Sequence, residues 1–165
     1  LTMNAGSFGH ETWEFVESAE VIDEAGTIHH LDTKEFKFSY RSVEFPFPLW
    51  FVSCLMKFPE SETTTKSELR AVRDQRIKTQ PLSEDTCGSV FKNPKSDHAG
   101  DLIERAGLKG YKIGGCSIST MHANFIVNEG GATSADIEEL IRHVQNVVKA
   151  KFDVNLETEV RIIGE

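Results

Sequence analysis

The first third of the chain carries the alternation of apolar and polar residues that is typical of β-strands. Val21-Ile22 and Thr27-Ile28 flank the segment Asp23-Glu24-Ala25-Gly26, an arrangement that predicts a hairpin turn. Two further features of this region are an alternating stretch at residues 36–41 and a proline-rich break at residues 45–48. Residues 13–58 are therefore predicted to be mostly β.

In the alternating stretch, aromatic and polar residues follow one another in the order Phe36, Lys37, Phe38, Ser39, Tyr40, Arg41. This order predicts a half-buried strand with Arg41 on its polar face. Pro46 and Pro48 must then interrupt regular pairing, because proline cannot donate to a strand ladder. A largely apolar strand is expected to resume from Trp50 to Phe58.

Helical spacing is found three times in the rest of the chain. Residues 66–78 predict a helix that is ended by Pro81, and residues 99–106 predict a short one with Gly107 at its C-terminal side. The clearest helix begins at a Thr133 or Ser134 cap. Its apolar stripe, predicted to be core, consists of Ile137, Leu140, Ile141, Val144, Val147 and Val148.

Two strands are expected around that last helix. Residues 124–128 predict a short strand that ends at Gly130-Gly131, and residues 154–163 predict a closing strand. The polar run at residues 60–65 is interpreted as a linker, and the domain boundary is placed between residues 60 and 82. The fold class is therefore predicted as α+β, a mostly β unit followed by a small α+β unit.

Composition and charge exclude several classes of function. The chain has 165 residues, 39% of them hydrophobic, and a formal charge of −8, which argues against general binding to nucleic acid or to anionic membranes. Its apolar runs are too short to span a bilayer. The odd number of widely spaced cysteines, Cys54, Cys87 and Cys116, fits reduced thiols and a cytoplasmic location. The chain also begins directly on a Gly-rich turn, from which we expect an N-terminal part to be missing.

Polar groups in two distant segments suggest a site for an anionic substrate. Ser89 follows Gly88, which allows close backbone approach, and Lys92-Asn93 adds a cation and an amide. In the predicted last strand, Glu159 and Arg161 share one face. Taken alone, a turn serine and a solvated strand face are the favoured interpretations of these residues.

Other catalytic patterns are not recognised in the sequence. Ser89 has no GxSxG context and no nearby histidine, so it is expected to donate a proton or hydrogen bond and not to be acylated. The six histidines show no metal-ligand spacing, and no metal site is predicted; His122 is expected to bond backbone at a strand entry.

A family resemblance gives these residues roles. Six segments in order along the chain resemble UDP-N-acetylenolpyruvoylglucosamine reductase, which makes UDP-N-acetylmuramate for bacterial peptidoglycan. They are Asn4–Gly9, Tyr40-Arg41, Cys87–Pro94, Ala106–Gly110, His122–Asn128 and Leu156–Arg161. The resemblance covers essentially the whole chain. The short link between Arg41 and Ser89 is similar to the compact class of the family, which lacks an extra substrate-covering loop.

The resemblance implies a division of the chain and a set of cofactors. Residues 1–58 would be part of a flavin-binding subdomain, residues 59–86 a connecting segment, and residues 87–165 the substrate-binding domain. FAD would be the cofactor and NADPH the electron donor. The family's N-terminal flavin subdomain is not in this sequence, which leads to the expectation that flavin binding is weakened or lost.

The resemblance also assigns residues. Ser89 would donate the proton, while Arg41 and Glu159 would stabilise the developing enolate. Substrate would be held by Asn93, Arg161 and Lys78, and cofactor by Asn4 and Gly6. Val43 stands where the family often carries a serine, a departure that alters the hydrogen bonding expected around Arg41. Two alternatives remain open, a flavin-free UDP-sugar-binding module and an inactive truncated chain.

Overall fold

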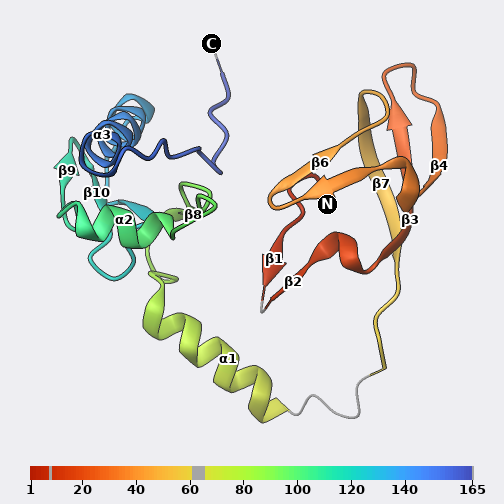
Figure 1. Ribbon diagram of the computed structural model, residues 1–165, viewed down its shortest axis with the longest axis horizontal. Helices are drawn as coiled ribbons and strands as arrows, with labels where there is room; N and C mark the ends of the chain where they lie inside the picture. Colours follow the sequence, from red (N-terminus) through yellow and green to blue (C-terminus); the bar gives the residue numbers. More distant parts are fainter. Residues whose placement is uncertain (8, 61–65, 165) are drawn as a thin grey trace. The chain divides into compact units, whose positions relative to one another are not determined.

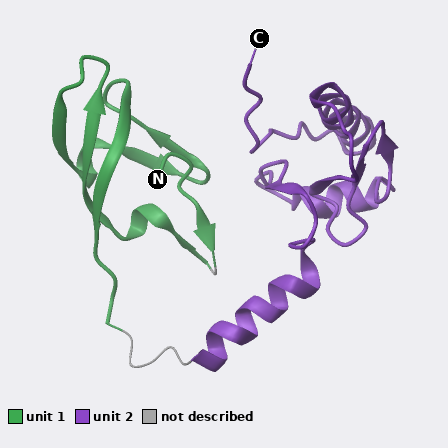
Figure 2. Cartoon of the chain, turned by 180° about the vertical axis from the view of Figure 1, so that it is seen from behind, with its two compact units in different colours: residues 1–63 green, residues 64–165 purple. Residues whose placement is uncertain are grey.

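The computed structural model describes residues 1–7, 9–60 and 66–164, and it divides into two compact units, residues 1–63 and 64–165 (Figures 1 and 2). Most of the predicted linker at residues 60–65, and Phe8 of the predicted Gly-rich turn, lie outside the described residues. Each unit has its own hydrophobic core. The mixture of sheets and helices confirms the predicted α+β class.

The first unit is built on a three-stranded antiparallel sheet with the order β4-β3-β7. Its strands are β3 (Val16–Asp23), β4 (Ile28–Asp32) and β7 (Leu49–Met56). The predicted hairpin turn is confirmed between β3 and β4, where the Asp23 Oδ1 atom accepts the backbone N–H groups of Ala25 and Thr27 at 2.9 and 2.8 Å. Gly26 in this turn has a φ of 81°, a left-handed conformation that suits glycine.

Short elements complete the first unit. They are β1 (Gly6–Ser7), β2 (His10–Glu11), η1 (Thr12–Glu14), η2 (Thr33–Glu35), β5 (Lys37–Ser39) and β6 (Ser42–Glu44). The proline-rich break falls between β6 and β7, as predicted. Trp13 is the largest buried side chain of the core, which also contains Val16, Ala19, Val21, Leu31, Phe36 and Leu49.

The prediction of one half-buried strand through residue 41 is wrong. β5 ends at Ser39, and Arg41 lies in a two-residue turn with a φ of 55°, after which the chain returns as β6. Phe38 and Tyr40 are 41% and 45% exposed, so only Phe36 of the three aromatics is buried. The physical reason is that β5 pairs only with β6, and a two-stranded ribbon buries little of its surface.

The second unit contains a four-stranded antiparallel sheet with the order β8-β11-β10-β9. Its strands are β8 (Thr86–Ser89), β9 (Lys112–Ile113), β10 (Cys116–Ile118) and β11 (Phe125–Asn128). Only β11 corresponds to a predicted strand in this region. β9 and β10 have only two and three residues, too few to show a recognisable period, and β8 contains a glycine and no large apolar residue.

All three α-helices of the described residues lie in the second unit: α1 (Lys66–Thr79), α2 (Ala99–Arg105) and α3 (Ser134–Phe152). Thr133 caps α3, accepting the Asp136 N–H, and Leu140, Ile141, Val144 and Val148 of the predicted stripe are buried. α1 confirms the predicted helix, but none of its residues is buried. No described helix is both long enough and apolar enough to cross a membrane.

The predicted closing strand at residues 154–163 is wrong as a strand. The segment is joined to the rest of the unit by a single antiparallel bridge, Phe91 to Thr158, and by nearby backbone hydrogen bonds. The partner segment reaches Pro94 three residues after Phe91, and proline has no N–H with which to extend a ladder.

Candidate functional site

Ser89 is the last residue of β8, where it pairs with Phe125 of β11. The preceding Gly88 has a φ of 84°, and its N–H bonds to the hydroxyl of Thr86 at 3.0 Å. This left-handed position favours glycine and explains why Gly88 precedes the serine. Ser89 is therefore placed by an edge strand with an irregular register at Gly88, not by the turn that was the favoured interpretation of the residue alone.

Glu159 lies on the segment that runs beside the continuation of β8. Its backbone N–H donates to the carbonyl oxygen of Val90 at 2.8 Å, and the Lys92 N–H donates to the carbonyl oxygen of Glu157 at 2.8 Å. The structure therefore brings Ser89 and Glu159, seventy residues apart in sequence, onto two hydrogen-bonded neighbouring segments. Their catalytic roles stay predictions.

The predicted substrate-binding residues are placed unevenly. Asn93 follows the Ser89 segment, and its Oδ1 atom accepts the Ala99 N–H at the start of α2, at 3.0 Å. Arg161 follows Glu159 on the second segment and is exposed. Lys78 is exposed in the last turn of α1 and takes no part in the hydrogen bonds that join these two segments. Asn93 and Arg161 thus extend the site, whereas the placement of Lys78 adds no support to its assignment.

The remaining predicted site residues meet within the first unit. A Cβ atom added to Gly6 would lie 3.1 Å from the Nη1 atom of Arg41, so the guanidinium lies against the bare backbone of this glycine. The same guanidinium is 5.0 Å from the centre of the Tyr40 ring. The structure therefore brings Arg41 and Gly6 together, and the arginine side chain lies near both the Gly6 backbone and the Tyr40 ring.

Asn4 supports this cluster through buried hydrogen bonds of its side chain. Its side chain is fully buried; Nδ2 donates to the Glu11 carboxylate at 2.7 Å and to the Ser39 carbonyl at 3.0 Å, and Oδ1 accepts the Trp13 N–H at 3.1 Å. Because the amide is used entirely within the unit, Asn4 has a structural role. Its predicted contact with cofactor gains no support from the structure, because the whole residue is buried and its backbone N–H donates to the Leu1 carbonyl at 3.0 Å.

One buried polar residue received no role from the sequence. Asn124 is 4% exposed, and its side-chain amide bonds to both backbone groups of Phe91, between Ser89 and Asn93. An asparagine immediately before an apolar strand was the available signal, because a buried amide needs partners.

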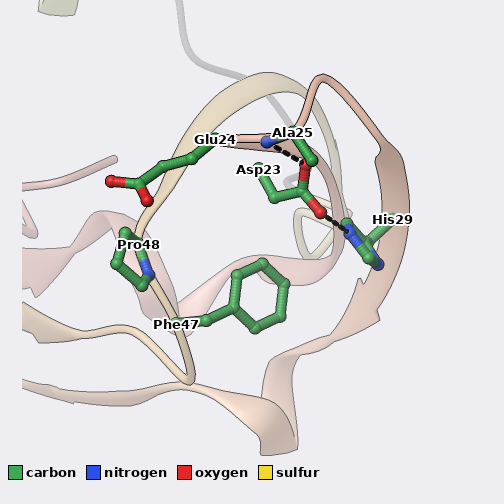
Figure 3. A pocket seen from close by; sticks show the side chains of 6 residues that line it. All are labelled: Asp23, Glu24, Ala25, His29, Phe47 and Pro48. Carbon is green, nitrogen blue, oxygen red and sulfur yellow. Dashed lines mark hydrogen bonds and ion pairs between the residues drawn. The ribbon is translucent and has the colours of Figure 1, made fainter.

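The pocket shown in Figure 3 is separate from these residues. It has a volume of about 320 Å³ and lies in the first unit at the β3–β4 turn; its lining consists of Asp23, Glu24, Ala25, His29, Phe47 and Pro48. His29 contacts the Asp23 carboxylate at 2.8 Å, which lowers the pKa of Asp23 together with the Thr27 N–H. None of the predicted site residues lines it. Within the described ranges, no group of three or more potential metal ligands is found.

His122 bonds backbone as predicted, since its Nδ1 atom accepts the Asn124 N–H at 3.2 Å. Burial is the main cause that lowers its pKa below the ordinary value of 6.5, because the imidazolium would lose solvation. The unfolded chain then binds this proton more tightly than the folded one. Neutral His122 therefore supports stability fully above about pH 6.5, and this support is lost as the pH falls toward the lower folded pKa.

We expect the thermal midpoint of helix unfolding, followed by circular dichroism at 222 nm, to fall between about pH 7.5 and about pH 5.5. The fall should be smaller in His122→Gln and unchanged in the control His143→Gln, whose ring stacks on Tyr111. The lowered pKa values of Asp97, Glu129 and Asp136 belong to a more acidic window, below their ordinary 3.8 to 4.5. Equal pH dependence in wild type and His122→Gln would contradict the prediction.

Comparison with known proteins decides the family. A family model described as UDP-N-acetylenolpyruvoylglucosamine reductase, C-terminal domain, matches residues 80–163. The chain belongs to this family. The match includes Ser89, Asn93, Glu159 and Arg161, whereas Lys78 and the Arg41 cluster lie outside it.

Two relatives named UDP-N-acetylenolpyruvoylglucosamine reductase extend the similarity to the first unit. The protein of Alkalilimnicola ehrlichii is 45% identical over 166 residues, which cover 100% of this chain and 56% of the relative. The protein of Bacillus subtilis is 40% identical over 98% of this chain and 54% of the relative. The chain thus spans about half the length of the reductases that it matches.

A solved structure agrees with the fold. The crystal structure of UDP-N-acetylenolpyruvylglucosamine reductase from Thermus caldophilus matches 97% of this chain and 57% of its own, with a TM-score of 0.81 and 34% identity. This reductase therefore shares the α+β architecture described above.

Proposed function

We propose that the chain carries the substrate-side catalytic residues of a flavin-dependent reductase that converts UDP-N-acetylglucosamine enolpyruvate to UDP-N-acetylmuramate in peptidoglycan synthesis. The observation that supports this most directly is the hydrogen bond from the Glu159 N–H to the Val90 carbonyl, which sets Glu159 beside the Ser89 segment. The free thiols of Cys54, Cys87 and Cys116 support a cytoplasmic setting.

Each residue has a definite task in this proposal. The Ser89 hydroxyl donates a proton to the substrate carbon that becomes electron-rich, and Arg41 and Glu159 stabilise or polarise the enolate form of the neighbouring carboxylate, Arg41 by its positive charge. Asn93 and Arg161 hold the nucleotide sugar, Arg161 by charge. A serine hydroxyl is a weak acid, so the proposal requires charged groups near the reacting atoms for the proton to move at a useful rate.

The first unit contains a segment suited to a flavin. Around Gly6 the backbone is bare and lies against Arg41, and the left-handed Asn4, with a φ of 41°, turns the chain there. Gly6 would hold FAD through its backbone, and the fully buried Asn4 would support that contact from within the unit. When bound, FAD would supply to the enol ether the hydride that it receives from NADPH.

A second function, a flavin-free UDP-sugar-binding module, is favoured by one observation. The family match is confined to residues 80–163, within the second unit, which has its own core. That unit holds Ser89, Asn93, Glu159 and Arg161, so nucleotide-sugar binding would not require the first unit.

Absorption and calorimetry separate these functions. For the reductase we expect purified protein to retain flavin bands through gel filtration after incubation with FAD, and to sustain NADPH oxidation over many turnovers only when the enolpyruvyl substrate is added. For the binding module we expect no retained flavin but binding of UDP-N-acetylglucosamine. Arg161→Gln should weaken that binding, and the control Arg142→Gln, an exposed α3 arginine paired with Glu138, should not. Absence of both flavin and nucleotide-sugar binding would contradict both proposals.

A further inference from the structure

The side chain of Asn124 behaves like a piece of β-strand backbone. Its Nδ2 atom donates to the Phe91 carbonyl at 2.8 Å, and its Oδ1 atom accepts the Phe91 N–H at 3.0 Å. Its own backbone carbonyl accepts the Val90 N–H at 2.9 Å. One residue thus satisfies three backbone groups on the segment that follows Ser89.

These bonds continue the β8–β11 ladder beyond the point where β11 begins. β8 and β11 pair up to Ser89 and Phe125, and β11 begins at Phe125, so Phe91 has no backbone partner from that strand. The amide of Asn124 fills this place because it offers a donor and an acceptor in one plane, as a peptide group does. Phe91 is buried, and its backbone groups would otherwise be unsatisfied.

The opposite edge of the same segment pairs with the chain around Glu159. Val90 O accepts the Glu159 N–H at 2.8 Å, and Phe91 bridges to Thr158. Residues 90–92 therefore lie between Asn124 on one edge and residues 157–160 on the other. A shift of Phe91 would move Ser89 relative to Glu159.

We propose that Asn124 is a positioning residue, which acts through Phe91 to set the Ser89 hydroxyl against Glu159. This rests on the proposed function of Ser89 and Glu159, although the geometric part can be tested without any nucleotide sugar. Leucine at this position would remove both hydrogen bonds, and an aspartate carboxylate would keep the acceptor but lose the donor.

The substitution Asn124→Asp offers a test in which pH adds or removes the hydrogen-bond donor. As a carboxylate, Asp would face the Phe91 carbonyl without a donor; as a carboxylic acid, it would regain one. The matched control is Asn128→Asp on the same strand, because Asn128 uses Oδ1 to accept the Gly130 and Ala132 N–H groups, which a carboxylate also accepts.

Titration of other charged groups near Asn124 also affects the spectra, and wild-type measurements at the same pH control for this. His122 faces Asn124 from its own segment, and Lys109, Asp101 and Glu104 act on His122. On the opposite edge of residues 90–92, the Lys92 Nζ atom lies 3.1 Å from the Glu157 carboxylate, two residues before Glu159. Each variant is therefore compared with wild type at each pH.

The readout is the ¹H–¹⁵N NMR spectrum of the full chain, with UDP-N-acetylglucosamine affinity measured in parallel. For Asn124→Asp we expect the Ser89, Lys92 and Glu159 amide signals to move from their wild-type positions at about pH 7.5 and to return toward them at about pH 5, because burial beside the Phe91 carbonyl raises the pKa of the new carboxyl above its ordinary value of about 3.9. The affinity should fall about tenfold or more at the higher pH and recover at the lower one. Asn128→Asp should match wild type in both measurements.

Each outcome decides the proposal. Signals of Ser89 and Glu159 that stay at their wild-type positions at both pH values would overturn it, even if affinity changed. If wild type binds no nucleotide sugar, the proposed function fails, while the amide signals still decide the positioning role. If Asn124→Asp does not fold at either pH, Asn124→Gln keeps the amide but moves it by one methylene; displaced Ser89 and Glu159 signals would then support the proposal, and unmoved signals would overturn it.

Discussion

The Ser89→Ala variant is expected to lose nearly all turnover while keeping its affinity for nucleotide sugar. Removing a positioned proton donor costs about 10²- to 10⁴-fold in rate, because the electron-rich carbon must then take its proton from water. The methyl group of alanine fits where the serine Cβ lies, so the ladder between β8 and β11 is kept. The measurement is NADPH oxidation by the FAD-loaded chain with the enolpyruvyl substrate, beside calorimetric binding of UDP-N-acetylglucosamine.

Ser117→Ala is the matched control for this variant. Ser117 lies on β10, which flanks β11 on the side opposite β8, and it is buried. Together with Lys112, it lowers the pKa of Glu129, which follows the far end of β11 from the Ser89 pairing. We expect turnover close to wild type in Ser117→Ala. A Ser89→Ala variant that turned over at the control's rate would remove Ser89 from the chemistry, and one that lost binding equally would make it a substrate ligand.

The features predicted correctly from sequence are those that depend on neighbouring residues. The Asp23–Gly26 turn depends on one carboxylate and a glycine, and α3 depends on its Thr133 cap and an apolar stripe of about three turns. Both signals are complete within twenty residues. No distant partner is needed to interpret them.

The errors fall where pairing depends on distant segments. The alternation ending at Arg41 continues through a turn because Tyr40 and Arg41 keep the aromatic–polar pattern, and arginine gives no sign that it adopts a left-handed φ of 55°. The segment at residues 154–163 has the alternation of a strand, yet its partner permits only one bridge. Periodicity shows which face of a segment is apolar, but it does not show whether a partner strand is available for pairing.

The site itself could be assembled from sequence only through resemblance. Ser89 and Glu159 lie on neighbouring segments because the C-terminal segment bonds to residues 90–92, which continue β8, and no local pattern contains this long-range pairing. Asn124 was missed for a related reason. Its partner, the Phe91 backbone, is 33 residues away, and a backbone group leaves no signature in the sequence.

The second large effect is expected in the first unit, where Asn4→Ala should lower the free energy of unfolding by about 4 kcal/mol. The substitution removes the donors to Glu11 and Ser39 and the acceptor for Trp13, all at a fully buried position. It also places alanine at a φ of 41°, which costs about 1 kcal/mol more than glycine there. Both tryptophans, Trp13 and Trp50, lie in this unit, so tryptophan fluorescence during urea unfolding reports its stability alone.

Asn4→Gly separates the two causes of this loss. Glycine accepts the left-handed φ but makes none of the three side-chain bonds, so it should lose about 3 kcal/mol, leaving the smaller remainder to backbone strain. Helix unfolding at 222 nm reports the second unit and should be unchanged in both variants, since α1, α2 and α3 all lie there. Because Asn4 holds the Ser39 carbonyl beside the turn that carries Arg41, the Arg41 cluster should loosen along with the unit. If Asn4→Ala unfolded at the wild-type urea concentration, these three buried bonds would not hold the cluster, and the structural role of Asn4 would be contradicted.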